Sequence, residues 1–478
     1  MNRKLVVRVV GLILGIEAIC MLPSLIIALI TGGEDLLPFC WSVALCALTS
    51  FLLLLVRQDS KRLQTRDGFV AVALCWIALS LFGALPYSFW GFSYADAVFE
   101  TVSGFTTTGA TIVAAPSALP RGLQFWRALT QWMGGMGVLV MVLALLPSLG
   151  EGSVNLMKAE SPGPISSKLR PKTSETAKSL YIIYIVLTVA EMIALCAAGM
   201  PVFDSITTAF TTISTGGFSV RDASIAHYGS ELINWIIVAF MFVSAVNFGA
   251  LFQLQRGQWK DALKSEELRL YAFITLGASA LIAADLFLKF GKGVYESISE
   301  AVFQVVTLMT TTGYATADFD LWPHFSKAVL LLVMFVGGCA GSTAGGVKVS
   351  RVVILFKGLR RELRRVLHTR EVRPLTLEGA RVEEGTVSSV SVFFFAYVVI
   401  MVLCAAVVSL DGVGLETSLS AALTTISNVG PGFSLIGPSY NFAFLSVLSK
   451  VTLSITMLLG RLEILPLLVL LFPSVWKK

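Results

Sequence analysis

Long apolar segments recur along the chain from one end to the other. A membrane-spanning helix needs about 20 consecutive apolar residues, and about ten segments of this 478-residue sequence are long enough. They cover residues 5–30, 38–56, 68–90, 122–149, 179–200, 232–254, 268–290, 328–355, 390–410 and 442–472. Hydrophobic residues make up 55% of the chain and charged residues only 14%, which argues against a water-soluble fold because soluble domains are about one quarter charged. The sequence therefore predicts an all-α, multi-pass integral membrane protein.

Basic residues gather in alternate loops between these segments. The clusters cover residues 57–66, 158–178, 256–269 and 348–373, and both chain ends are also basic. Since positively charged loops remain on the cytoplasmic side of a membrane, we expect the clusters and both termini to be cytoplasmic. The opposite loops carry acidic residues that suit a face where cations are concentrated. These acids are Glu34, Asp35, Asp222, Asp318, Asp320 and Asp411.

Four short polar segments, each containing glycine, interrupt the apolar pattern between long segments. They lie at residues 105–111, 213–219, 309–316 and 426–434. When they are aligned on Gly109, Gly216, Gly313 and Gly430, they recur about every hundred residues, as an internal repeat would. A short apolar, hydroxyl-rich run precedes each one. It can form about two or three helical turns, which is too short to cross a bilayer and long enough to re-enter it.

The predicted repeating unit is a helix, a half-helix, a glycine loop and a second helix. Two crossings per unit return the chain to the same side, so all four loops lie on the outer face and can meet around one axis. An inverted repeat would need an odd number of crossings. The predicted parts are an N-terminal transmembrane hairpin at 1–60 and pore repeats at 61–150, 151–257, 258–373 and 374–478. Treating the segments as ordinary interhelical loops leaves four equally placed copies unexplained.

The loop residues suit a filter for a dehydrated monovalent cation. A ring of backbone carbonyls can replace the water shell of such an ion, and glycine tolerates the conformations that aim successive carbonyls at one axis. Hydroxyls of Thr and Ser before the glycines add oxygens or satisfy backbone groups. The loops contain no carboxylate, which fits a monovalent ion better than a divalent one. The candidate filter residues are Thr107, Thr108, Gly109, Ala110, Ser214, Thr215, Gly216, Gly217, Thr311, Thr312, Gly313, Tyr314, Asn428, Val429, Gly430 and Pro431.

Five short motifs carry a family resemblance that extends over nearly the whole chain. They are TTGAT at 107–111, STGGF at 214–218, TTGYA at 311–315, NVGPG at 428–432 and QWMGGMG at 131–137. The set resembles the Trk/Ktr/HKT superfamily of potassium transporters, in which one chain carries four degenerate copies of a potassium-channel pore unit. The resemblance implies four pseudo-fourfold helix–pore-loop–helix repeats around one central pore. It also implies K+ as the transported ion, and we expect no organic cofactor in this chain.

The hairpin ahead of the first repeat is similar to the added helix pair of bacterial TrkH-type subunits. This resemblance implies potassium uptake across the bacterial cytoplasmic (inner) membrane, a homodimer, and a nucleotide-binding regulatory ring on the cytoplasmic side. Sodium-permeable plant relatives carry Ser at the first loop position, where this chain has Gly109. Glycine in all four loops therefore implies a preference for potassium. We expect the lipid bilayer as a partner and no nucleic acid.

A glycine-rich segment at 337–348 falls in the middle of the third inner segment. Its glycines would each destabilise a helix by about 1 kcal/mol relative to alanine, so we expect the chain to unwind there. Unwound backbone at membrane depth is tolerated where it is buried or lines water, which indicates a loop that gates the pore below the filter, and the family resemblance implies the same. The alternative is close helix packing through small residues spaced by four. The candidate gate residues are Gly337, Gly338, Gly341, Ser342, Thr343, Gly345, Gly346 and Lys348.

Charged residues also lie inside the apolar segments, where they are costly and are usually paired or functional. For Arg461 we consider a salt bridge to Glu463 or to an acid on a neighbouring helix and, as the resemblance implies, an electrostatic barrier that faces the pore below the filter. Glu17, Glu191 and Asp285 leave open a rival function, a proton- or sodium-coupled potassium symporter. Their dispersal along the chain favours structural contacts with polar neighbours.

A basic run at 351–370 follows the third inner segment. It predicts a cytoplasmic helix face that rests on anionic lipid or couples the gate to a soluble partner. The histidines His227, His324 and His368 share no motif, and the sequence offers no cluster of nucleophile, base and metal ligands. We therefore expect a transport protein and not an enzyme.

Overall fold

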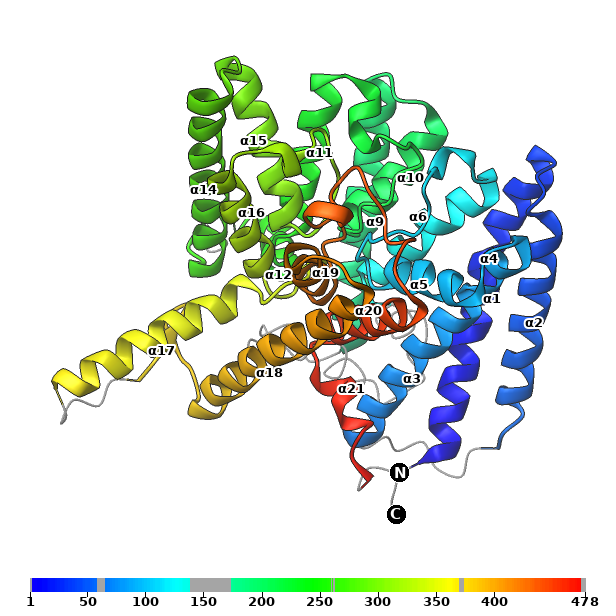
Figure 1. Cartoon of the computed structure of the whole chain (residues 1–478). Coiled ribbons are helices and arrows are strands. Elements are labelled where there is room, and N and C mark those ends of the chain that lie inside the picture. Colours follow the sequence, from blue (N-terminus) through cyan, green and yellow to red (C-terminus); the bar gives the residue numbers. More distant parts are fainter. Residues whose placement is uncertain are drawn as a thin grey trace.

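The part of the chain that the structure describes is almost entirely helical (Figure 1). The computed structural model describes residues 2–57, 65–137, 173–258, 260, 263–368 and 374–473. Most of the predicted basic cluster at 158–178 lies outside these residues. Within them, strands are confined to β1 (Thr376–Leu377) and β2 (Ala380–Arg381), an antiparallel pair with Thr376 opposite Arg381. The prediction of an all-α fold is confirmed.

Four units share one order of elements, which is an outer helix, a short pore helix, a loop and an inner helix. The outer helices are α3 (Thr65–Gly83), α9 (Thr173–Ala197), α14 (Glu266–Phe290) and α18 (Glu384–Val408). The pore helices are α5 (Tyr94–Phe105), α10 (Val202–Ile213), α15 (Val294–Met309) and α19 (Leu415–Ile426). The inner helices are α6 (Arg121–Gly135), α11 (Glu231–Ser244), α16 (His324–Val336) and α20 (Val447–Arg461).

Other elements of the described residues connect or extend these units. The additional α-helices are α4 (Leu85–Trp90), α12 (Phe248–Gln255), α17 (Val349–Leu367) and α21 (Leu465–Val469). The 3-10 turns are η1 (Pro116–Ala118), η3 (Ser224–Tyr228), η4 (Phe319–Leu321), η5 (Ser409–Asp411) and η6 (Ser434–Ile436). Four of these turns (η1, η3, η4 and η6) lie between a pore loop and the following inner helix, so the return path has a similar form in all four units.

Each pore helix carries an acidic residue in its first turn, where negative charge is favourable because of the helix dipole. The four acids are Asp96, Asp204, Glu296 and Glu416. They form ion pairs with Lys450, Arg221, Lys292 and Lys327, respectively. Three of the pore helices have 12 residues and α15 has 16, so they are somewhat longer than the predicted two or three turns. The N-terminal end of every pore helix is thus stabilised by a local charge.

The four units close into a ring around the pore helices. Each pore helix packs against the outer and inner helices of its own unit and against the inner helix of the preceding unit. For the second, third and fourth pore helices, these preceding helices are α6, α11 and α16. The first pore helix, α5, packs against α20 of the last unit. This cyclic pattern is the pseudo-fourfold arrangement that the repeats predict.

The inner segments are shorter than the sequence predicts. Six described helices are long and apolar enough to cross a membrane, or seven if α11 and α12, which meet at a bend of 101°, form one span. The predicted segments 232–254, 328–355 and 442–472 are bent or broken, and 122–149 is described only to residue 137, so none of these four inner segments forms one long helix within the described residues. The last turns of two inner helices, α6 and α20, lie against the ends of pore helices, where Gly134 and Gly460 leave no room for a side chain. A Cβ on Gly460, for example, would lie 2.1 Å from the carbonyl oxygen of Ile426 at the end of α19.

The N-terminal hairpin, formed by α1 (Arg3–Thr31) and α2 (Leu36–Leu54), covers one side of the first unit (Figure 1). The two helices lie close together because Gly11 has no side chain, and the hydroxyl of Ser50 donates a 2.7 Å hydrogen bond to its carbonyl. α1 also packs against α3 and α6, and Asp35 accepts a hydrogen bond from the backbone N–H of Leu123. The hairpin is therefore anchored to the first unit along its length.

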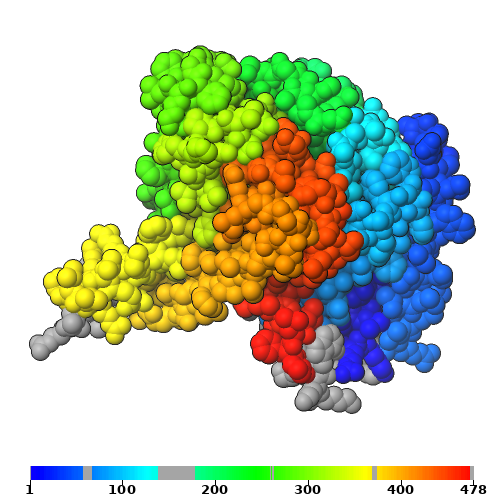
Figure 2. All heavy atoms as spheres, in the orientation of Figure 1, coloured from blue at the N-terminus to red at the C-terminus, as the bar shows by residue number. Residues whose placement is uncertain are grey.

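The basic run forms α17, which projects from the body of the molecule as an arm (Figure 2). One face carries basic side chains, of which Lys357 pairs with Glu266 and Arg361 with Glu384. Large exposed apolar side chains also lie on this helix: Phe356, Leu359, Leu363, Val366 and Leu367. α21 and the start of α1 lie toward the same end of the molecule (Figure 1).

Candidate ion site between the four loops

The four pore helices end with the same backbone turn. The second residue beyond each helix has a positive φ near 57° and is not glycine. These residues are Thr107, Thr215, Thr311 and Asn428, with φ of 57°, 56°, 58° and 55°. The next N–H then returns to a carbonyl in the last turn of the helix, as in a Schellman cap. These bonds run from Thr108 to Ser103, Gly216 to Thr211, Thr312 to Thr307 and Val429 to Thr424, at 2.8–2.9 Å. Four different sequences thus adopt one loop conformation.

One glycine follows this turn in every loop and also has a positive φ. The four are Gly109, Gly217, Gly313 and Gly430, with φ of 80°, 73°, 84° and 99°. The sequence alignment on Gly216 is therefore wrong by one residue, because Gly217 occupies the equivalent backbone position in the second loop. Two adjacent glycines are indistinguishable by sequence, and only the conformation separates them.

The same four glycines bring neighbouring loops into direct contact. A Cβ on Gly109 would lie 2.3 Å from the Gly216 carbonyl oxygen, and one on Gly217 would lie 1.8 Å from that of Thr312. The contacts continue from Gly313 to the Val429 oxygen at 2.2 Å and from Gly430 to the Thr108 oxygen at 2.7 Å. Each loop glycine therefore abuts a carbonyl of the next loop, and the fourth returns to the first. A closed ring results, in which none of the four positions has room for a side chain.

Buried hydroxyl groups stiffen the ring. In the first loop the hydroxyls of Thr106 and Thr108 lie 2.7 Å apart, and the third loop repeats this contact between Thr310 and Thr312 at 2.8 Å. In the fourth loop, the amide nitrogen of Asn428 donates to the Thr108 hydroxyl at 2.8 Å. Asn428 thus links its own loop to the first loop.

Other candidate filter residues contact neighbouring loops and pore helices. The Tyr314 hydroxyl lies 2.5 Å from the hydroxyl of Thr211 in the neighbouring pore helix. Ser214 caps that helix, Ala110 is buried, and Pro431 Cδ lies 2.8 Å from the Cβ position of Gly313. The structure therefore gathers all four predicted loop segments in one place.

The glycine-rich segment 337–348 is not helical and separates α16 from α17, so the prediction that it unwinds is confirmed. Gly337, Gly341 and Gly346 adopt positive φ, with Lys348 at 78°. A Cβ on Gly337 would lie 2.4 Å from the Gly345 carbonyl oxygen of the same segment. The small residues therefore allow the segment to fold on itself. The alternative of close packing between helices is wrong here, because no helix is present.

Hydrogen bonds attach the glycine-rich segment to three of the four loop regions. The N–H of Gly345 donates to the Thr311 hydroxyl at 2.8 Å, and that of Gly346 donates to the Ser427 carbonyl at 2.9 Å. The Thr343 hydroxyl donates to the Ile213 carbonyl at the end of α10. Of the remaining candidates, Gly338 accepts a hydrogen bond from the Val349 N–H at the start of α17, and the Ser342 hydroxyl donates to the Cys339 carbonyl.

Arg461 connects the glycine-rich segment to the first loop region. Its guanidinium donates to the carbonyls of Thr343 at 2.9 Å and Gly135 at 2.7 Å, and to the Thr107 hydroxyl at 3.4 Å. The Glu463 carboxylate, which the sequence offers as a partner for Arg461, pairs with Arg351. Arg461 is therefore held by backbone oxygens at the level where the glycine-rich segment meets the loops.

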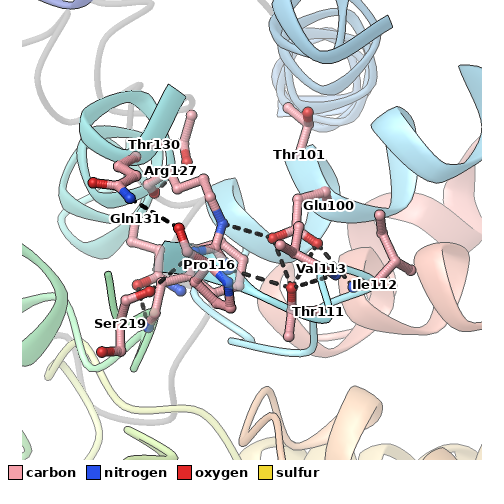
Figure 3. A network of polar contacts seen from close by, with 12 residues as sticks. Glu100, Thr101, Thr111, Ile112, Val113, Pro116, Arg127, Thr130, Gln131 and Ser219 are labelled. Atoms are coloured by element: carbon pink, nitrogen blue, oxygen red, sulfur yellow. Dashed lines mark hydrogen bonds and ion pairs between the residues drawn. The ribbon is translucent and has the colours of Figure 1, made fainter. Parts of the chain in front are cut away.

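A buried ion pair that the sequence analysis missed lies beside the first loop (Figure 3). Arg127 Nε on α6 lies 2.8 Å from the Glu100 carboxylate on α5, and their side chains are 2% and 0% exposed. Glu100 also accepts hydrogen bonds from the Thr111 hydroxyl at 2.9 Å and the Ile112 N–H at 3.0 Å. Arg127 donates to the Ser219 carbonyl of the second loop at 3.0 Å. The pair therefore joins the chain just beyond the first loop to the second loop.

The available signal for this pair was a carboxylate within the apolar run before the first loop and an arginine within the first inner segment. Charges at such positions are rare unless they are paired. The two residues are 27 positions apart in the chain, so they do not lie three or four residues apart on one helix. Their contact follows only from the packing of α5 against α6.

Replacement of Arg127 by Leu is expected to lower the melting temperature of the purified protein in detergent by several degrees. The change leaves the Glu100 carboxylate buried without its cation, and breaking a buried pair in this way costs about 3–5 kcal/mol. The double variant Glu100→Leu/Arg127→Leu should recover part of the loss. Arg365→Leu is the matched control, because that guanidinium is 70% exposed in its contact with Glu362 and surface pairs contribute little. An Arg127→Leu protein as stable as the parent would contradict this role.

The three acids that raised the symporter alternative lie in separate environments. Asp285 on α14 accepts a 2.7 Å hydrogen bond from Ser326 and pairs with Lys289. Glu17 is buried in α1 near the Cys46 thiol, and Glu191 is buried in α9. They belong to three different helices, of which α1 is part of the N-terminal hairpin and α9 and α14 are outer helices of the second and third units. The expectation of polar structural neighbours is confirmed for Asp285.

The fold and the loop ring define an all-helical membrane protein of the pore-loop type. A family model described as TrkH, cation transport protein, matches residues 39–267 and 286–478. The chain belongs to this TrkH family. It is 38% identical to the Trk system potassium uptake protein TrkH of Salmonella typhimurium over 493 residues, with 100% of both chains covered. It is 33% identical to TrkG of Escherichia coli K12, with 99% of both covered.

A solved structure extends the comparison to three dimensions. The crystal structure of the potassium transporter TrkH from Vibrio parahaemolyticus matches with a TM-score of 0.89 and 35% identity, and 100% of both chains is covered. The recognition of this family from the loop motifs is thereby confirmed. These relatives are transporters by name, in agreement with the expectation that the chain is not an enzyme.

Proposed function

We propose that this chain takes up potassium across the cytoplasmic membrane of a bacterium through a selective pore at the centre of its four loops. Curated relatives that cover the full chain are named Trk system potassium uptake proteins. The observation that carries the pore is the closed ring in which each loop glycine abuts a carbonyl of the next loop. Such a ring brings backbone oxygens from four loops together, and four-loop rings of carbonyls can replace the water around K+.

In this proposal the filter consists of residues 107–110, 215–218, 311–314 and 428–431, with the second loop moved by one residue from the sequence prediction of 214–217. Its selectivity depends on a backbone held at one spacing. The shared Schellman turns and the lack of room at the four glycines support such rigidity. The pore helices end at the loops, so their C-terminal partial negative charges favour a cation there.

The glycine-rich segment, residues 337–348, serves as the gate. Its bonds to Thr311, Ser427 and the end of α10 support a closed position against the loops, and its glycines permit the backbone rotation that opening requires. Arg461 serves as an electrostatic barrier at the same level, since its guanidinium donates both to this segment and to Thr107.

The proposal includes a homodimer and a cytoplasmic nucleotide-binding ring that acts on the gate. The relatives' name, a Trk system, supports an assembly of several parts. α17 continues directly from the glycine-rich segment and projects from the body, so a partner bound to it would act on the gate through one helix (Figure 2). Both termini are cytoplasmic in this proposal. The basic clusters support that orientation, as does the placement of α21 and the start of α1 at one end.

Reversal potentials in proteoliposomes test the proposed passive conduction. With opposed potassium and proton gradients, the reversal potential is expected to follow the potassium gradient and to stay constant when the pH on one side changes. A potential that moves with pH or with the sodium gradient would instead support coupled symport. The matched control is the Gly313→Ser protein. If the current passes between the four loops, the reversal potential of this variant should no longer follow the potassium gradient.

A further inference from the structure

Position 216 differs from its counterparts in the other three loops. The equivalent residues are Thr108, Thr312 and Val429, so the second loop alone has no side chain there. Gly216 is also absent from the described glycines with positive φ, which include its neighbour Gly217. The backbone conformation therefore does not require glycine at this position, and another contact must explain it.

The Gln131 side chain on α6 occupies the space that a side chain at 216 would need. A Cβ on Gly216 would lie 2.4 Å from Gln131 Cδ, 2.5 Å from Oε1 and 2.8 Å from Nε2. Gln131 is completely buried. It lies one helical turn from Arg127, on the side of α6 that faces the loops (Figure 3). The carboxamide thus substitutes for the missing side chain of the second loop.

The carboxamide also fixes the backbone on both sides of Gly217. Gln131 Nε2 donates to the Gly216 carbonyl at 2.7 Å, and Oε1 accepts from the Phe218 N–H at 3.0 Å. A donor and an acceptor in one planar group match these two backbone groups, whereas a carboxylate or a hydrocarbon can match at most one of them. The Gly216 carbonyl is the oxygen that abuts Gly109, so it belongs to the ring.

We propose that Gln131 is a positioning residue that determines potassium selectivity by holding the Gly216 carbonyl of the second loop. Two consecutive glycines give this loop the least restricted backbone of the four, and the carboxamide supplies the restraint that side chains supply elsewhere. Without it, the Gly216 peptide can rotate and the ring loses one of its fixed oxygens. The inference rests on the proposed filter.

The first test is the Gln131→Leu variant, reconstituted as the full chain in proteoliposomes. The variant keeps the side-chain volume and removes both hydrogen bonds. We expect transport to continue and the potassium-over-sodium permeability ratio to fall by about tenfold, which corresponds to about 1.4 kcal/mol. Gln131→Met, which is also unbranched and has no hydrogen-bond donor, should show the same loss and carries the test if the Leu variant does not fold. An unchanged ratio in a folded variant overturns the inference.

A double variant separates positioning from simple space filling. Gly216→Ala alone should fail to give a monodisperse protein in size-exclusion chromatography, because its Cβ meets Gln131. Gln131→Ala/Gly216→Ala should restore folding and transport, since the new methyl group enters vacated space, but the ratio should remain low. Full recovery of the ratio would mean that the pair only fills space, and the inference would be wrong. Gly217→Ala/Gln131→Ala is the matched control and should stay defective, because the Gly217 Cβ meets the Thr312 backbone oxygen at 1.8 Å.

The Gly109→Ser variant, measured in parallel, distinguishes failure of this inference from failure of the filter. If Gly109→Ser changes the ratio and Gln131→Leu does not, the filter stands and Gln131 has no selective role. If neither variant changes the ratio, the proposed filter itself is wrong.

Discussion

Replacement of Gly109 by Ser is expected to lower the potassium-over-sodium permeability ratio by at least about tenfold, or about 1.4 kcal/mol of discrimination. Gly109 has a φ of 80°, which costs a residue with a Cβ about 1–3 kcal/mol. Its Cβ would also lie 2.3 Å from the Gly216 carbonyl oxygen, so the first and second loops must move apart. A wider ring fits the spacing of K+ less well and admits sodium. Bi-ionic reversal potentials in proteoliposomes measure the ratio.

Gly229→Ser is the matched control for this substitution. Gly229 also has a positive φ, 54°, but nothing lies within 4 Å of its Cβ position, so the change adds backbone strain without a collision. We expect the control to keep the parental ratio. An unchanged ratio in Gly109→Ser would show that the first loop does not discriminate between the ions.

Replacement of Arg461 by Ala is expected to raise the potassium flux by about tenfold. Two unit charges 4 Å apart repel by about 4 kcal/mol at the effective dielectric constant of a protein near its surface, so a fixed guanidinium below the filter opposes a passing cation. The substitution also releases the Thr343 carbonyl of the glycine-rich segment, which favours opening. Isotope uptake into potassium-loaded vesicles measures the flux.

Arg461→Lys separates the charge from the contacts. Lysine keeps the positive charge but lacks the planar fork that reaches several carbonyls at once. If the barrier is electrostatic, the Lys variant should retain low flux while the Ala variant does not. Equal increases in both variants would assign the effect to the lost hydrogen bonds, and parental flux in the Ala variant would refute the barrier.

The sequence predicted the parts of the fold that repeat. Four glycine loops at equal places between apolar segments were sufficient for the ring, and the glycines of segment 337–348 were sufficient for the break before α17. The continuity of the inner helices could not be predicted, because an apolar run looks the same whether it is straight or broken. The breaks depend on contacts such as Gly460 against Ile426, which come from a different part of the chain.

The sequence predicts which segments form the candidate site, but it does not predict which residues of those segments contact one another. The second-loop glycine was placed one residue early, since Gly216 and Gly217 differ only in conformation and in what surrounds them. The residues that restrain the loops from α6, Arg127 and Gln131, act on partners many positions away. The sequence analysis includes Gln131 only as part of the QWMGGMG motif, and it does not identify Arg127. Contacts between units do not follow any periodicity within a unit.

The packing of α5 against α20 has a consequence for how the protein is made. Until the last inner helix, α20, leaves the ribosome, the first pore helix lacks one of its packing partners. Asp96 also lacks Lys450, the cation with which it pairs. The unit synthesised first is thus completed by the one synthesised last. A nascent chain that stops before residue 447 lacks α20, so the side of α5 that packs against α20 stays uncovered.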